Sequence, residues 1–238
     1  RTLPQMKFVY TGPSWANSSF PIDSSSTNLS KEWGIPCINY SKLGSNVLQC
    51  LGPVTSSTLR VVWVYHEPFG CLADATGLSK EQLIQRSDWK DIWNECNQFC
   101  LKAIASLNRP VLLIGGHSDI VDCDYPNITI AHNSWQKFLA EKAGMPVTNN
   151  EVYVKMDDGG DFSIKHCWGA EFIHRFMHEH SNIEPSVEIT NATWDIFFFW
   201  KELEKANLFH DVHPNYQGNK LFAEFLKPIV QKFLEDIK

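Results

Sequence analysis

Two residues at opposite ends of the chain have the types that acyl-transfer chemistry requires. Ser14 follows a strand-like run at residues 7–11 and lies in a turn of sequence GPSW. His213 lies in the stretch NLFHDVHPNYQGN, just before an amphipathic segment. A serine hydroxyl becomes a good nucleophile when a neighbouring base takes its proton, and histidine suits that task at neutral pH. The pair therefore predicts nucleophilic catalysis if the fold brings the two ends of the chain together.

The same reaction needs an acid that orients the histidine and donors that stabilise the oxyanion. Asp211 is the expected acid, because a carboxylate beside an imidazole fixes its tautomer, and His210 is the alternative. The backbone N–H groups of Ser14 and Gly44 are the expected oxyanion donors. Loss of one such donor typically costs about 100- to 1000-fold in rate. A third donor is expected from Asn46, His66 or His117.

Alternating segments of strand and helix character predict the scaffold for these residues. Apolar, β-branched runs predict strands at residues 7–11, 35–39, 59–65, 109–116 and 127–132. Helical spacing and capping signals predict helices at residues 27–34, 79–107, 134–144 and 218–237. In the helix at 79–107 the apolar stripe includes Phe99, which we therefore expect to be buried. Such alternation implies a parallel sheet covered on both faces, with the active site at the carboxyl ends of its strands.

Taken together, the GPSW turn, the LGSN stretch at 43–46 and the HPNYQG stretch before the last helix resemble the SGNH (GDSL-type) hydrolases. The resemblance covers most of the chain except residues 146–209. It implies a three-layer α/β/α, flavodoxin-like SGNH hydrolase fold with a mostly parallel five-stranded sheet of order 2-1-3-4-5. It also implies ester hydrolysis, with Ser14 as nucleophile, Gly44 in the oxyanion hole and His213 as base.

The chain departs from the family pattern at three points. Pro13 stands where the family usually has an aspartate, and Asp211 lies two residues before the histidine instead of three. The turn after the third strand reads YHEP, so that Glu67 occupies the position of the family's asparagine donor. A carboxylate donates a hydrogen bond only when it is protonated. We therefore expect Glu67 to point into the cleft, either as a neutral acid or hydrogen-bonded to His66 or another cleft group.

Residues 146–209 interrupt the strand–helix alternation without a linker-like composition. We interpret residues 1–238 as a single domain in which this stretch is an insertion that covers the cleft. The stretch contains histidines at positions 166, 174, 178 and 180, and an acidic turn at 157–161. Neither has the spacing of a known zinc or calcium motif, so no metal and no cofactor are expected.

Composition and charge limit the classes of partner that the chain is expected to bind. The net charge of −6, without a basic block, argues against nucleic-acid binding, and no apolar run is long enough to span a membrane. The seven cysteines are scattered, which favours reduced thiols and a cytoplasmic location. N-x-S/T sequons leave export open; they begin at Asn17, Asn28, Asn39, Asn127 and Asn191. The oligomeric state has no signal in the sequence.

Two functions from different classes remain after this reading. The first is a serine esterase that acts on a small acyl ester, either a small molecule or a glycan such as an O-acetylated carbohydrate. The alternative is a catalytically silent SGNH-fold protein that binds a glycan or another ligand in the same cleft. The missing third-strand asparagine and the shifted aspartate motivate the alternative.

Overall fold

The computed structural model describes residues 7–17, 28–42, 45–65, 68–78, 82, 88–116, 120–145, 147–148, 151–155, 161–164, 202–210 and 213–235. Its centre is a five-stranded parallel sheet of order β2-β1-β3-β4-β5. The strands are β1 Phe8–Thr11, β2 Cys37–Asn39, β3 Arg60–Val64, β4 Val111–Ile114 and β5 Ile128–His132. The α/β class and the flavodoxin-like strand order expected from the sequence are therefore confirmed.

The inner strands consist mainly of apolar residues because helices cover both of their faces. Every residue of β1 and β4 is buried, as are the last four residues of β3. In the edge strand β5 no residue is fully buried: Thr129 and Ile130 are exposed and the other three residues are half-buried. β1 pairs directly with β3, from Phe8 opposite Arg60 to Thr11 opposite Trp63. The carboxyl ends of the first and third strands are thus neighbours, as the predicted strand order requires.

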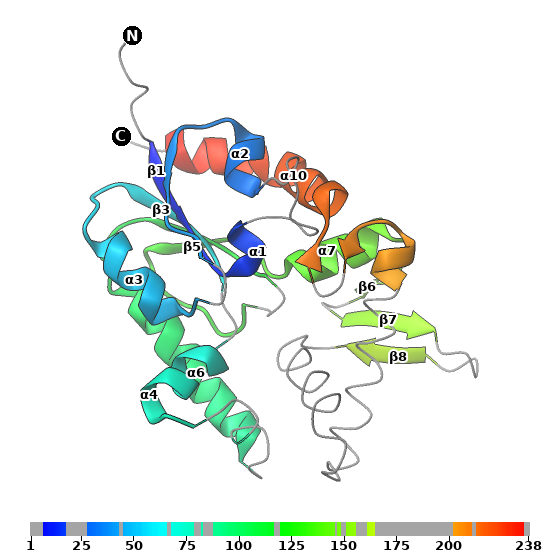
Figure 1. Cartoon of the computed structure of the whole chain (residues 1–238), viewed down its shortest axis with the longest axis horizontal. Coiled ribbons are helices and arrows are strands. Elements are labelled where there is room, and N and C mark those ends of the chain that lie inside the picture. The colour runs from blue at the N-terminus through cyan, green and yellow to red at the C-terminus, as the bar shows by residue number, and fades with distance from the viewer. Residues whose placement is uncertain are drawn as a thin grey trace.

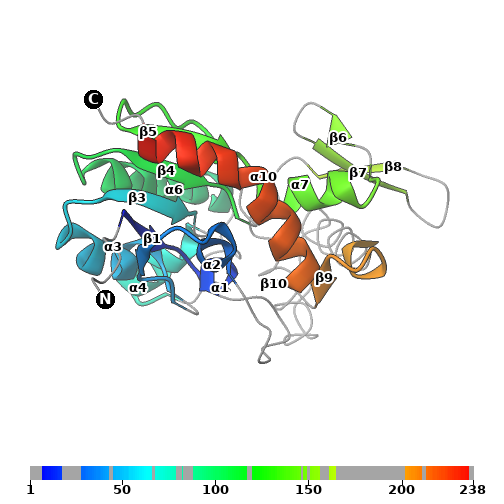
Figure 2. The same ribbon diagram turned by 90° about the horizontal axis from the view of Figure 1, so that it is seen from above.

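Helices form a layer on each side of the sheet (Figure 1 and Figure 2). One side is covered by α2 Leu29–Trp33, α7 Trp135–Lys142 and α10 Tyr216–Glu235. The other side is covered by α3 Val47–Thr55, α4 Phe69–Thr76 and α6 Trp89–Ala105. A further short helix, α1 Ser14–Asn17, follows β1 directly. No helix within the described ranges is both long and apolar enough to cross a membrane.

Trp33 joins the first strand to the last helix. Its indole Nε1 donates a hydrogen bond to the Ala223 carbonyl of α10 at 3.1 Å. Its ring also meets the ring of Tyr10 edge-on, with 5.7 Å between centroids. Because Ser14 follows β1 and His213 precedes α10, this packing sets the relative position of the two segments that carry the candidate catalytic residues.

The observed helices differ from the expected ones in three places. Within the expected helix at 79–107, α6 runs from Trp89 to Ala105, and its Phe99 is 54% exposed instead of buried. The buried face of α6 runs through Trp93, Cys100 and Ile104, and Phe99 lies about 100° around the helix from Cys100. Helices α3 and α4 were not expected, because α3 contains Gly52 and Pro53 and α4 is short.

Between residues 147 and 214 the described strands form two small antiparallel ladders. The first is a three-stranded sheet made of β6 Val147–Thr148, β7 Glu151–Lys155 and β8 Asp161–Ile164. The second pairs β9 Phe209–His210 with β10 His213–Pro214. β6 and β7 contact α7, and the sheet lies beside that helix in Figure 1. The acidic turn at 157–160 and the histidine-rich segment lie outside the described residues, so the role of this stretch as a lid stays a prediction.

Candidate functional site

Ser14 and His213 are in direct contact. The Ser14 Oγ and the His213 Nε2 lie 2.9 Å apart, although 199 positions separate the two residues in the chain. Ser14 is the first residue of α1 at the carboxyl end of β1, and Figure 2 shows α1 beside β10, the strand that contains His213. His213 is 9% exposed and Ser14 is half-buried. The two residues singled out from the sequence for their chemistry therefore form a hydrogen-bonded pair.

The turn that presents Ser14 depends on Gly12. This glycine has φ of 148°, a backbone conformation that other residues rarely adopt. A Cβ atom at this position would lie 2.6 Å from the Cβ of Ala16 and 2.8 Å from the carbonyl oxygen of Val64. The Pro13 carbonyl then accepts a hydrogen bond from the Ala16 N–H at 2.9 Å, which closes the first turn of α1. The strand can therefore end against β3 and still turn sharply into a helix that begins with the serine.

The loop after β2 is bound to the same turn. The Gly12 carbonyl accepts a hydrogen bond from the Lys42 N–H at 3.1 Å and a long one from the Ser45 Oγ at 3.4 Å. Gly44 lies between these two residues in sequence and outside the described residues, so its oxyanion role stays a prediction. The described neighbours of Gly44 nevertheless connect its loop to the serine turn.

The segment around His213 is bound to the start of α10. Asn215 caps the helix, because its side chain accepts a hydrogen bond from the Gly218 N–H at 3.0 Å. The Asn215 N–H donates to the Leu208 carbonyl at 3.1 Å. A Cβ atom on Gly218 would collide with the same carbonyl, so the glycine in the HPNYQG stretch permits this close approach. The HPNYQG stretch, which identified His213 in the sequence, therefore also contains the two residues, Asn215 and Gly218, that hold the adjoining backbone in place.

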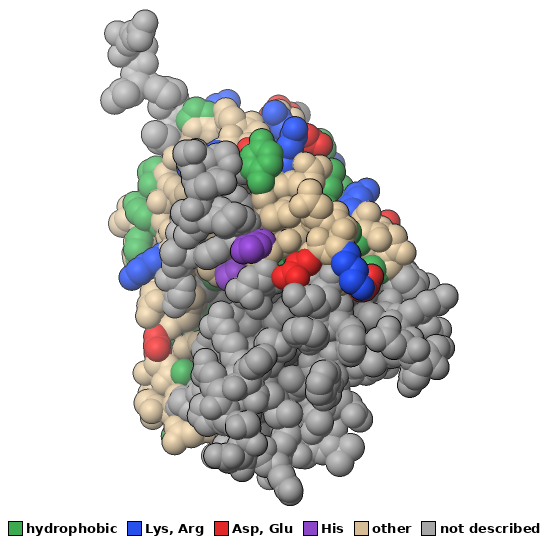
Figure 3. Space-filling model, turned by 45° about the vertical axis from the view of Figure 1, so that its right-hand side comes forward, with side chains coloured by type: hydrophobic (Ala, Val, Ile, Leu, Met, Phe, Trp, Pro, Cys, Tyr) green, Lys and Arg blue, Asp and Glu red, His purple; other side chains and the backbone are tan. Residues whose placement is uncertain are grey.

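His210 lies opposite His213 in the β9–β10 ladder and is exposed. Directly opposite residues of an antiparallel pair project to the same face. Figure 3 shows histidine side chains side by side on one face of the described part, with acidic and basic side chains close by. His210 is therefore on the same face of this ladder as His213, whereas Asp211, the expected orienting acid, lies outside the described residues.

Asn46, one of the three candidate third donors, is engaged in local structure. Its side-chain oxygen caps α3 by accepting a hydrogen bond from the Gln49 N–H at 3.0 Å. Its Nδ2 donates to the Asp74 carboxylate of α4 and, at 3.4 Å, to the Gly70 carbonyl. These contacts direct the amide towards α3 and α4.

The other candidate donors, His66 and His117, and the unusual Glu67 lie outside the described residues. The described residues next to these positions are joined by contacts to β4 and α6. The Tyr65 N–H donates to the Ile114 carbonyl at 2.7 Å, and the Tyr65 hydroxyl donates to the Asn97 Oδ1 at 2.6 Å. A Cβ atom on Gly116 would lie 3.0 Å from the Tyr65 carbonyl oxygen. The chain therefore leaves β3 at Tyr65 and β4 at Gly116 side by side, at the carboxyl edge of the sheet where Ser14 lies.

The strand behind the serine turn is fully buried. Tyr10 is fully buried, and desolvation, with a smaller contribution from Cys37, raises the pKa of its phenol well above the usual value. The Tyr10 hydroxyl and the Thr11 Oγ1 have no hydrogen-bond partner within the described part of the chain. A hydrogen bond formed at the rim of such an interior is electrostatically stronger than one in open water.

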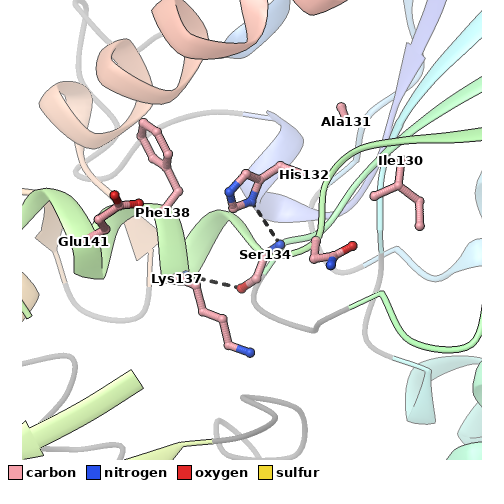
Figure 4. Close-up of a pocket in the computed structure, with 8 residues that line it drawn as sticks. Ile130, Ala131, His132, Ser134, Lys137, Phe138 and Glu141 are labelled. Atoms are coloured by element: carbon pink, nitrogen blue, oxygen red, sulfur yellow. Dashed lines mark hydrogen bonds between the residues drawn. The ribbon is translucent and has the colours of Figure 1, made fainter. Parts of the chain in front are cut away.

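A separate hollow of about 490 Å³ lies between β5 and α7 (Figure 4). His132, Ser134, Lys137, Phe138 and Glu141 are among its lining residues. The Ser134 N–H donates to the His132 Nδ1 at 3.2 Å, and the Ser134 Oγ caps α7 by accepting from the Lys137 N–H at 3.3 Å. Neither Ser14 nor His213 lines this hollow. The Ser134 hydroxyl and the His132 imidazole stabilise the turn between β5 and α7.

The comparisons with known proteins add no family assignment. No protein-family model matches the chain, and neither the curated proteins nor the solved structures give a significant match. Within the described residues no three His, Cys, Asp or Glu side chains are grouped so that they could hold a metal ion. The geometry of Ser14, His213 and the segments that hold them is therefore the basis on which a function can be assigned.

Proposed function

We propose that this protein is a serine ester hydrolase of the SGNH type that acts on small acyl esters, including O-acetyl groups on carbohydrates. The observation that carries the proposal is the 2.9 Å contact between the Ser14 Oγ and the His213 Nε2. It occurs at the carboxyl edge of a parallel sheet, where α/β enzymes bind their substrates. The order of the motifs along the chain supports the same assignment.

In the proposed reaction a neutral His213 accepts the Ser14 proton at Nε2 while the Ser14 Oγ attacks the ester carbonyl carbon. The π electrons of the carbonyl move to its oxygen, which becomes an oxyanion. The tetrahedral intermediate then collapses: the carbonyl re-forms and the C–O bond to the alcohol breaks. The imidazolium returns the proton to the leaving alcohol. A water molecule, deprotonated by His213, then attacks the acyl-serine; the bond to the Ser14 Oγ breaks, the imidazolium returns the proton to that oxygen, and the carboxylic acid is released. The scheme needs no cofactor.

The oxyanion is held by backbone donors in this scheme. Ser14 opens α1, and the first N–H groups of a helix have no partner within the helix. The Ser14 N–H is therefore available to the developing negative charge, and Gly44 is the proposed second donor. Asp211 is the proposed orienting acid, with a smaller effect on rate than His213, because substrate binding and the oxyanion donors remain when it is replaced.

Hydrolysis of a panel of p-nitrophenyl esters tests the proposal. We expect acetyl and butyryl esters to be cleaved by the wild type and not by Ser14→Ala or His213→Ala, with circular dichroism showing that both variants fold. A Ser14→Ala protein as active as the wild type would contradict the assignment of the nucleophile. If no ester in the panel and no acetylated oligosaccharide is cleaved, the binding-protein alternative replaces the enzyme.

A further inference from the structure

Asn219 is a fully buried polar residue in the first turn of α10, where an apolar residue would be expected. Its Nδ2 donates to the Pro214 carbonyl at 3.1 Å and to the Asn215 carbonyl at 3.0 Å. Both amide hydrogens are therefore directed at the two residues that follow His213. Asparagine has a low helix propensity, so helix stability alone does not explain its presence here.

These contacts fix one peptide unit at both of its polar ends. The carbonyl of the Pro214–Asn215 peptide accepts from the Asn219 Nδ2, and its N–H donates to the Leu208 carbonyl at 3.1 Å. The proline ring fixes the φ angle of Pro214. A peptide plane held at both ends next to a residue of fixed φ leaves little freedom to the backbone of His213, which directly precedes it.

The Oδ1 of Asn219 is buried and has no hydrogen-bond partner among the described residues. An unsatisfied buried acceptor destabilises the folded state, so the amide is a poor choice for stability alone. Leucine would fill a similar volume without that cost. What the amide provides and leucine does not is the pair of hydrogen bonds to the backbone after His213.

We propose that Asn219 is a positioning residue that holds the His213 Nε2 against the Ser14 Oγ. This inference rests on the proposed function as far as its effect on rate is concerned. The geometric part, that Asn219 sets the position of the His213 ring, is independent of any activity. The two parts are tested by different measurements on the same variants.

The first variant is Asn219→Leu in the full-length chain. We expect kcat for p-nitrophenyl acetate to fall about 10- to 100-fold, because a misplacement on the order of 1 Å has effects of that size, while KM changes less than about 3-fold. Nitrogen–proton correlation spectra of the histidine rings should show the His213 signals shifted. Asn219→Ser keeps a hydroxyl that can reach the Asn215 carbonyl, and should recover part of the loss.

Asn127 offers a matched control at another place in the fold. Its Nδ2 also bridges two backbone carbonyls, those of Ala105 and Arg109, at 2.9 and 3.1 Å. It lies just before β5, at the amino edge of the sheet and away from Ser14. Asn127→Leu removes the same number of hydrogen bonds, and should leave both kcat and the His213 signals unchanged.

The outcomes separate the two proposals. An unchanged His213 spectrum together with a kcat within 2-fold of the wild type in Asn219→Leu would overturn the positioning role, as would an equal loss in Asn127→Leu. If Asn219→Leu fails to fold, the same comparisons apply to Asn219→Ser. A wild-type protein without esterase activity in which Asn219→Leu still moves the His213 signals would contradict the proposed function and leave the positioning role intact.

Discussion

Gly12 and Val64 are packed so closely that the glycine has no room for a side chain. A Cβ atom on Gly12 would lie 2.8 Å from both the Cβ and the carbonyl oxygen of Val64. Combined with a φ of 148°, this contact predicts that Gly12→Ala destabilises the fold by at least about 2 kcal/mol. Urea unfolding checks the loss. The same variant should also lose the contact between Ser14 and His213, since the turn that presents the serine must shift.

Gly52 provides the control for this substitution. It lies within α3, and apart from its chain neighbours and the backbone of its own helix no described atom is within 4 Å of the position where its Cβ would be. Alanine is a better helix former than glycine, whereas a side chain before Pro53 crowds the proline ring, so Gly52→Ala should change stability by less than about 1 kcal/mol in either direction. A Gly12→Ala protein as stable as Gly52→Ala would show that the described turn is wrong.

Asn46 should behave as a capping residue. Asn46→Ala is expected to lower the free energy of unfolding by about 1–2 kcal/mol, through loss of the α3 cap and of the contact with Asp74. The esterase kcat should stay within a few-fold of the wild type. A fall in kcat of about 100-fold or more, the effect of removing an oxyanion donor, would instead restore Asn46 as the third donor.

Tyr10 should make the folded state sensitive to alkaline pH. Burial raises the pKa of its phenol well above 10 in the folded state, whereas the same phenol in the unfolded chain has a pKa near 10. Its contribution to stability is therefore fully present below pH 10 and declines above it, as the unfolded state releases its proton while the folded state keeps it. Tyr10→Phe removes that part of the decline.

The same substitution should cost little at neutral pH. The Tyr10 hydroxyl has no hydrogen-bond partner within the described residues. Its removal is therefore expected to lower the free energy of unfolding by no more than about 0.5 kcal/mol, and can raise it by up to about 2 kcal/mol. Urea denaturation of wild type and Tyr10→Phe at pH 7 and pH 10.5 measures both effects. A clear loss at pH 7, with an unchanged alkaline decline, would contradict the described environment.

The sheet could be predicted because its strands are strongly patterned. The runs that became β3 and β4 are continuously apolar, and such runs are typical of strands buried on both faces. Helices α3 and α4 were missed for the opposite reason, because Gly52 and Pro53 in α3 contradict local helix propensity. Tertiary packing of α3 against α6 overrides that propensity.

The candidate site could be predicted in its residue types and less in its supporting contacts. The GPSW and HPNYQG stretches marked Ser14 and His213, but their 2.9 Å contact depends on how Trp33 of α2 packs between Tyr10 of β1 and helix α10. Asn219 was missed, although one signal was available: a polar residue in the otherwise apolar face of the last helix. Asn46 carried the sequence signal of a helix cap, and its burial between α3 and α4 required the fold.

Modification by a fluorophosphonate tests the central claim most directly, because the probe bonds covalently to an activated serine and requires no knowledge of the natural ester. We expect the wild type to be labelled at one site, which peptide mass spectrometry assigns to Ser14. His213→Ala should lower the labelling rate by at least about 1000-fold, since the serine then lacks its base. Labelling at another serine, or equal rates for wild type and His213→Ala, would contradict the account.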